Sequence, residues 1–169
     1  MEYYLLGDIM EYKSTLPYPA LKVESKNIEY AKMLLHPYAS MISEDTSTHL
    51  YLYQSFIVDE EISETLKHIA IVEMHHLDML ARTINLLGLD PKYEVDFHPW
   101  TAQYVKYNKN ISQMMLTNIK NETLAIKNYR SLIKAIDDRY IKQLLRRIII
   151  DEEIHLKIFN DIYNKVKDT

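Results

Sequence analysis

Apolar residues recur with the spacing of a helix along most of the chain. The first such pattern begins at about residue 27, and its apolar positions are Ile28, Ala31, Leu34 and Leu35. These positions share one helix face, because an α-helix completes a turn about every 3.6 residues. Pro37 lies in the same stretch and predicts either a kink or the end of a short first helix. We expect the main first helix to run from there to about Val58.

Three further helices are predicted by the same periodicity and by their terminal residues. Asp59 is suited to cap the second helix. That helix is expected to stop at Gly88, because a glycine followed closely by a proline is a strong C-terminal signal. The third helix is expected over about residues 111–136 and the fourth over about 139–166, with two aspartates at 137–138 marking the turn and the cap between them.

Two segments lack a steady period. Residues 1–26 hold four tyrosines and two prolines, and we expect an extended arm with at most a short helical piece. Residues 88–109 contain two more prolines and are predicted to form a long connection between the second and third helices. The sequence therefore predicts an all-α fold, a four-helix bundle with one long crossover. It divides the chain into an N-terminal arm, 1–26, and one bundle domain, 27–169.

Composition narrows the possible functions. The chain has 169 residues, which fits one domain with a substantial core. Its net charge of -4 is mild and does not favour nucleic acid as a partner. The sequence has no cysteine, which excludes disulfides, zinc–thiolate sites and iron–sulfur centres. The first residues do not read as a signal peptide, and no stretch is apolar enough for a membrane span, so we expect a cytoplasmic protein without a membrane partner.

One pattern of glutamate, tyrosine and histidine occurs twice in the chain. Each copy has a glutamate, a tyrosine seven residues later, and a Glu-x-x-His motif that begins 29 or 30 residues after the first glutamate. The first copy consists of Glu44, Tyr51, Glu73 and His76, and the second of Glu122, Tyr129, Glu152 and His155. Such an internal repeat predicts an approximate two-fold axis through the place where the copies meet.

The spacing of this repeat agrees with the predicted turns. In an antiparallel helical hairpin, two residues at the same height are equally far from the turn. The midpoint of residues 44 and 73 falls between Val58 and Asp59, and the midpoint of 122 and 152 is Asp137. Both midpoints coincide with turns predicted from capping residues. The glutamates should therefore meet within the bundle, roughly 20 Å from the turns at about 1.5 Å per residue.

Glutamate and histidine in this arrangement are typical of a site for two metal ions. Residues three apart share a helix face, so each Glu-x-x-His motif can offer a carboxylate and an imidazole together. Four carboxylates carry a charge that balances two divalent cations, and oxygen and nitrogen ligands without sulfur suit Fe, Mn or Co. The alternative is a pair of solvated helix faces. The run of apolar residues before Glu73 disfavours it, because a buried acid is costly unless it binds something.

The segments LYLYQSF, IAIVEMHHLDML and IIIDEEIHL resemble the ferritin-like superfamily, which includes rubrerythrins, bacterioferritins and manganese catalases. The resemblance covers about residues 27–167. It implies a ferritin-like bundle and two divalent ions, Fe or Mn, bound by Glu44, Glu73, His76, Glu122, Glu152 and His155. It also implies that Tyr51 and Tyr129 hydrogen-bond a ligand carboxylate or relay a proton or electron. The chain departs from rubrerythrins in lacking cysteines for a Cys₄ iron site.

Several residues allow a second interpretation. His75 adjoins His76 but points about 100° away on the helix, so a role outside the ligand set is favoured. Asp151 and Glu153 flank Glu152 and are weaker candidates for the ligand position. Trp100 is interpreted as an anchor of the crossover on the bundle, with gating of the site as the alternative.

The leading functional hypothesis is an oxidoreductase whose dimetal centre reacts with hydrogen peroxide or dioxygen. With Mn, its activity would resemble that of a manganese catalase. With Fe, its activity would resemble that of a peroxidase or a ferroxidase. The alternative is bacterioferritin-like iron binding or storage without turnover, and a third hypothesis is an interaction protein with a vestigial site. We expect a homodimer or higher homo-oligomer, in which the arm is a candidate contact. The native metal and the electron donor stay open at this stage.

Overall fold

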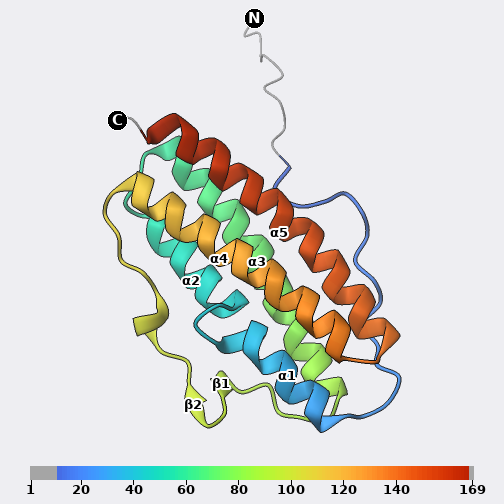
Figure 1. The fold of residues 1–169 in the computed structure, drawn as a ribbon. Helices are drawn as coiled ribbons and strands as arrows, with labels where there is room; N and C mark the ends of the chain where they lie inside the picture. The colour runs from blue at the N-terminus through green and yellow to red at the C-terminus, as the bar shows by residue number, and fades with distance from the viewer. Residues whose placement is uncertain (1–10, 168–169) are drawn as a thin grey trace, which may run out of the picture.

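Two helical hairpins lie side by side and form a bundle in the computed structural model, which describes residues 11–167 (Figure 1). The helices are α1 (Ile28–Ala39), α2 (Glu44–Ser55), α3 (Glu60–Leu86), α4 (Ile111–Ala135) and α5 (Arg139–Val166). The helix α2 pairs with α3, and α4 pairs with α5. The helix α1 packs mainly against the C-terminal part of α3. The prediction of an all-α bundle with one long crossover is confirmed. In the described part of the chain, no helix meets the length and hydropathy needed to cross a bilayer.

The helix ends fall where their capping residues predict them. Asp59 caps α3 by accepting a hydrogen bond from the Ile62 amide, and Asp138 caps α5 by accepting from Tyr140 and Ile141. Gly88 follows α3 with a φ of 98°, a left-handed conformation that glycine adopts without a steric penalty. The two hairpin turns therefore lie at the midpoints of the repeated glutamates.

The first predicted helix is broken in two just before Glu44. The helix α1 contains Pro37 and ends at Ala39, and α2 begins at Glu44 with Ser43 as its N-cap. Of the two predictions for Pro37, the short separate helix is the correct one, since a kink alone would leave a continuous helix. The expectation that the helix extends to Val58 is wrong by three residues, because α2 ends at Ser55.

Side-chain hydroxyls hold the break in place. Ser43 Oγ and Thr46 Oγ1 each donate a hydrogen bond of 2.7 Å to the carbonyl oxygen of Ser40. Thr46 Oγ1 in turn accepts a 2.9 Å hydrogen bond from Trp100 Nε1 in the crossover. Trp100 therefore ties the crossover to the first turn of α2, which is the anchoring geometry expected of it.

The crossover contains a small hairpin that the sequence pattern did not predict. Strands β1 (Glu94–Val95) and β2 (His98–Pro99) pair antiparallel, and a 3₁₀ turn, η1 (Ala102–Tyr104), follows. Asp96 and Phe97 form the hairpin turn with φ values of 49° and 65°. Each strand has only two residues, too few to produce a detectable alternation of apolar and polar positions.

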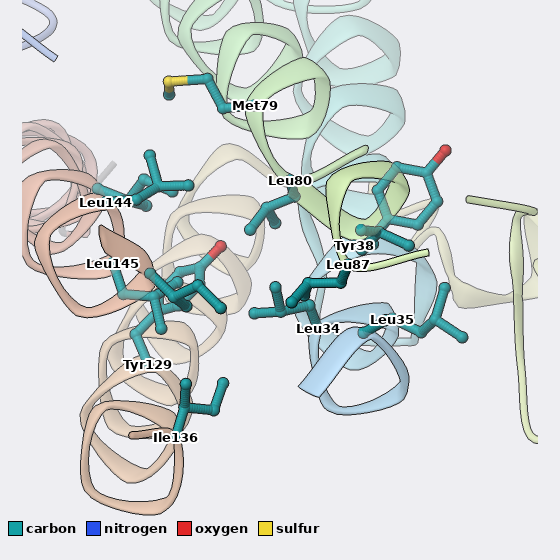
Figure 2. Close-up of a cluster of buried hydrophobic side chains, with 14 of the residues drawn as sticks. Leu34, Leu35, Tyr38, Met79, Leu80, Leu87, Tyr129, Ile136, Leu144 and Leu145 are labelled. Carbon is teal, nitrogen blue, oxygen red and sulfur yellow. The ribbon is translucent and has the colours of Figure 1, made fainter. Parts of the chain in front are cut away.

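Two apolar clusters flank the middle of the bundle. Figure 2 shows the first, which includes Leu34 and Leu35 of α1, Leu80 of α3, and Leu144 and Leu145 of α5. The second cluster lies towards the other end of the helices and includes Leu50, Leu66, Met114, Met115 and Phe159. The repeated glutamates and histidines lie along the helices between these clusters, so that apolar packing fixes the helices on both sides of them.

The described part of the arm, residues 11–26, is extended and runs along α5 (Figure 1). Arg147 holds it by donating hydrogen bonds of 2.9 Å to the carbonyl oxygens of Leu16 and Ser14. The Glu24 amide donates a 2.7 Å bond to Asp138 near the end of the arm. The first ten residues of the predicted arm lie outside the described residues, and a role of the arm in a dimer contact stays a prediction.

Candidate metal centre

The six repeated acids and histidines meet at one point inside the bundle. Each of them exposes between 0 and 3% of its surface. They form two groups in which ligand atoms lie within 4.8 Å of one another: Glu44, Glu73, His76 and Glu152, and Glu73, Glu122, Glu152 and His155. Glu73 and Glu152 belong to both groups. The arrangement is that of two neighbouring cation sites that share two carboxylates.

Both histidines point the same ring atom at the carboxylates. His76 Nδ1 lies 3.0 Å from Glu152 Oε1 and 3.4 Å from Glu73 Oε2. His155 Nδ1 lies 2.9 Å from Glu73 Oε1 and 3.4 Å from Glu152 Oε2. Each shared carboxylate therefore has one oxygen near each imidazole, as bridging ligands between two cations require.

The two tyrosines of the repeat join the hairpins to each other. Tyr51 on α2 donates a hydrogen bond to Glu122 on α4, and Tyr129 on α4 donates one to Glu44 on α2. Burial raises the pKa of both tyrosines well above 10, and the nearby carboxylates add to the effect. Both hydroxyls therefore keep their protons and orient the two unshared carboxylates. A catalytic role for these tyrosines stays a prediction.

Unsatisfied polar atoms at the centre fit bound cations. Within residues 11–167, Glu73 Oε1, Glu152 Oε1, His76 Nδ1 and His155 Nδ1 are buried and have no hydrogen-bond partner of good geometry. Some of these atoms lie about 3 Å apart, yet their angles do not make hydrogen bonds. Leaving such atoms unbonded is costly, whereas two cations that share Glu73 and Glu152 would satisfy all of them. The donor set of four carboxylates and two imidazoles suits two Fe or Mn ions.

The charges of the metal-free centre depend on protons. Burial raises the pKa of Glu122, and the charges of Glu152 and Glu73 raise it further. Burial alone lowers the pKa of His155, but the charges of Glu73 and Glu152 outweigh it and raise that pKa to about 10. Cations that bind here must displace these protons, because a ligating imidazole is neutral and a ligating carboxylate is ionised.

Asp151, which the sequence offers only as a weaker candidate for the ligand position, lies behind a histidine of the centre. It is fully buried next to Glu152, but it does not belong to either ligand group. Its Oδ2 lies 3.0 Å from His76 Nε2, on the far side of the ring from the centre, and fixes the orientation of that ring. Arg147 Nη1 donates to Asp151 Oδ1 at 2.6 Å, and Tyr18 donates to Oδ2 at 2.5 Å. The sequence signal for this role is the position of Asp151, an acid directly before Glu152 and directly after an apolar run.

The support of the second histidine is different. His155 Nε2 lies 2.9 Å from the carbonyl oxygen of Tyr12 in the arm. In the repeat, the position that corresponds to Asp151 is Val72, which cannot accept a hydrogen bond. The arm therefore supplies a backbone oxygen where the first hairpin lacks a carboxylate, and the local two-fold symmetry ends at this point.

The neighbouring candidates lie outside the centre. His75 is exposed and its ring packs edge-on against Tyr18. Glu153 forms an exposed ion pair of 2.8 Å with Arg130. Neither residue belongs to a ligand group, in agreement with the helix-face argument.

The fold and the centre together define a ferritin-like protein with a dinuclear metal–carboxylate site. The family model described as "Rubrerythrin" matches residues 38–163, and the chain belongs to this family. That range contains all six residues of the centre but not the arm.

Individual relatives include a probable manganese catalase and a bacterioferritin. The chain is 30% identical over 171 residues to a probable manganese catalase of Clostridium acetobutylicum, covering 88% of this chain and 76% of that protein. It is 27% identical over 129 residues to a bacterioferritin of Desulfovibrio desulfuricans, covering 71% and 68%. Its fold is similar to the crystal structure of a manganese catalase from Anabaena, with a TM-score of 0.83, 24% identity, and 92% and 80% of the chains covered.

Replacement of Asp151 tests how strongly it ties the arm and His76 to α5. Asp151→Ala leaves Arg147 buried without its carboxylate, so we expect the free energy of unfolding of the metal-free chain to fall by about 3–5 kcal/mol. Urea unfolding followed by circular dichroism measures this change. Asp161→Ala, an exposed aspartate on the same helix, is the control. A loss below about 0.5 kcal/mol, the usual range for surface substitutions, would show that the buried pair is not structural.

Proposed function

We propose that the protein is a dinuclear manganese or iron enzyme that consumes hydrogen peroxide, with manganese-catalase-like disproportionation as its main reaction. The observation that carries this proposal is the pair of ligand groups that share Glu73 and Glu152. Two adjacent redox-active ions can exchange two electrons with an O–O bond, which is the chemistry that bound metals would supply. The 30% identical relative that is described as a probable manganese catalase supports the same reaction.

The residues of the chain serve this reaction by holding the centre and limiting its contact with water. Tyr51 and Tyr129 fix Glu122 and Glu44, and Asp151 fixes His76. The six proposed ligands are nearly inaccessible to solvent, so metal-bound reactants would be separated from bulk water. Disproportionation also needs no separate electron donor, because peroxide is both the oxidant and the reductant.

Oxygen release from the manganese-loaded protein tests the proposal. We expect two molecules of hydrogen peroxide to yield one O₂ and two water molecules over many turnovers, measured with an oxygen electrode. The metal content of protein purified without added metal identifies the native ion by elemental analysis. The control is the same amount of free Mn²⁺ in buffer. Oxygen release no faster than from this control would rule out the catalase proposal.

Iron oxidation and storage is the second candidate, because the bacterioferritin relative aligns with 71% of the chain. In that case the iron-loaded protein would oxidise added Fe²⁺ without releasing O₂ from peroxide. The proposal also includes a homodimer or higher homo-oligomer, a cytoplasmic location and a role under oxidative stress. Size-exclusion chromatography with light scattering separates a dimer from a large cage.

A further inference from the structure

A narrow cavity leads from the break between α1 and α2 to the carboxylates of the centre. Its inner wall is formed by the four glutamates, Glu44, Glu73, Glu122 and Glu152. Its outer wall includes Ile42, Ser47, Ala125 and Asn128. All four outer residues are partly or fully exposed, whereas the inner glutamates are buried, so the cavity lies between the surface and the centre.

The cavity is very small. Its volume is about 10 Å³. A volume of about 10–15 Å³ holds roughly one water molecule. The cavity therefore holds about one water molecule, so hydrogen peroxide or a diatomic molecule would enter only as the lining side chains move, and a branched organic molecule is far too large.

The break before Glu44 shapes this opening. A continuous helix would carry the chain straight through residues 40–43, but here the backbone leaves the helical path and returns at Ser43. The hydrogen bonds of Ser43 and Thr46 to the Ser40 carbonyl hold the backbone in this path, and Trp100 braces Thr46. The opening is thus fixed by buried or half-buried hydrogen bonds.

The opposite face of the centre is covered. Tyr12 lies against His155 through its carbonyl oxygen, and Tyr18 lies against Asp151 and His76. Arg147 holds the intervening arm residues through their carbonyl oxygens. A reactant that approaches the histidines from this face would have to displace the arm.

We propose that the cavity at the α1–α2 break is the entrance for the oxidant, and that Ser47 and Ala125 limit its size to that of hydrogen peroxide or dioxygen. Both residues have small side chains and face the cavity from opposite helices, α2 and α4. The proposal rests on the proposed function only for the identity of the oxidant. Access of a small neutral molecule to the metal centre can be tested without turnover.

Nitric oxide is a suitable probe, because it is diatomic, uncharged and gives a spectral change when it binds ferrous iron. We expect Ala125→Leu and Ser47→Leu in the di-ferrous protein to slow nitric oxide binding at least tenfold in anaerobic stopped-flow measurements. Thr123→Leu adds the same side chain to an exposed position of α4 and should bind at the wild-type rate. Elemental analysis must show two metal ions in each variant, so that a slower rate reflects access.

A second variant changes the opening in the other direction. Ala125→Gly should bind nitric oxide at the wild-type rate or faster, because it removes the side chain that faces the cavity. If both leucine variants hold two metal ions and bind nitric oxide at a rate within twofold of wild type, the proposal that this cavity is the entrance is wrong. If the leucine variants bind nitric oxide more slowly but the wild-type protein does not consume peroxide, the entrance is supported and the proposed function is rejected.

Discussion

Glu152→Ala is expected to lose both metal ions, whereas Glu153→Ala keeps both. Glu152 belongs to both ligand groups, so its removal takes one ligand from each cation and leaves His76 Nδ1 and His155 Nδ1 without their shared neighbour. Glu153 is the adjacent exposed residue and pairs only with Arg130. Elemental analysis of proteins purified in parallel, without added metal, measures the difference. Glu73→Ala should behave like Glu152→Ala, since Glu73 is the other shared carboxylate.

The unshared glutamates provide a graded comparison. Glu44 and Glu122 each belong to one group only, so Glu44→Ala or Glu122→Ala should lower the affinity for one ion more than for the other. Two tightly bound ions per chain in Glu152→Ala would show that the ligand assignment is wrong. Circular dichroism of the metal-free variants shows that metal loss does not result from unfolding.

Removal of the metal ions is expected to lower the melting temperature of the protein by about 15–30 °C. Ligand present at about 1,000 times its Kd stabilises the folded state by about 4 kcal/mol per site. Two sites give about 8 kcal/mol, and each kcal/mol shifts the melting temperature of a domain of this size by about 2–4 °C. The physical reason is the cost of the buried carboxylates and imidazoles, whose unsatisfied atoms are paired only when cations are bound.

Differential scanning calorimetry with and without a chelator measures this shift. Glu152→Gln is the matched control, because it keeps the shape of the side chain, removes one buried charge and should not respond to the chelator. Equal melting temperatures of the loaded and chelated wild-type protein would contradict a high-affinity centre.

The bundle and its turns were predictable because their causes are local. The caps Asp59 and Asp138 and the conformation of Gly88 depend on neighbouring residues, and the helices end within a few residues of the predicted positions. The convergence of the six acids and histidines also followed from local information. Helix periodicity sets their faces, and the turn midpoints set their heights.

The supports of the centre depend on contacts between distant segments and were not predictable in the same way. Asp151 acts on His76, which lies 75 residues away, and no periodicity connects these positions. The arm has no repeating pattern from which its path along α5 could be derived, although Tyr12 and Tyr18 fix both histidines through it. The break at residues 40–43 was only partly predictable. Pro37 indicated a kink or a helix end, but the serine that caps α2, Ser43, is not distinguished from other serines by its sequence neighbours.

The contact between the arm and His155 has a consequence for the biosynthesis of the protein. Tyr12 and His155 are separated by 143 residues, so one partner is made long before the other. At about 5–20 residues per second, a ribosome needs roughly 7–30 s to extend the chain from the arm to this histidine. During that time Glu44, Glu73 and His76 exist without α5. The complete centre can take up its ions only after nearly the whole sequence has been synthesised, so metal selection follows translation.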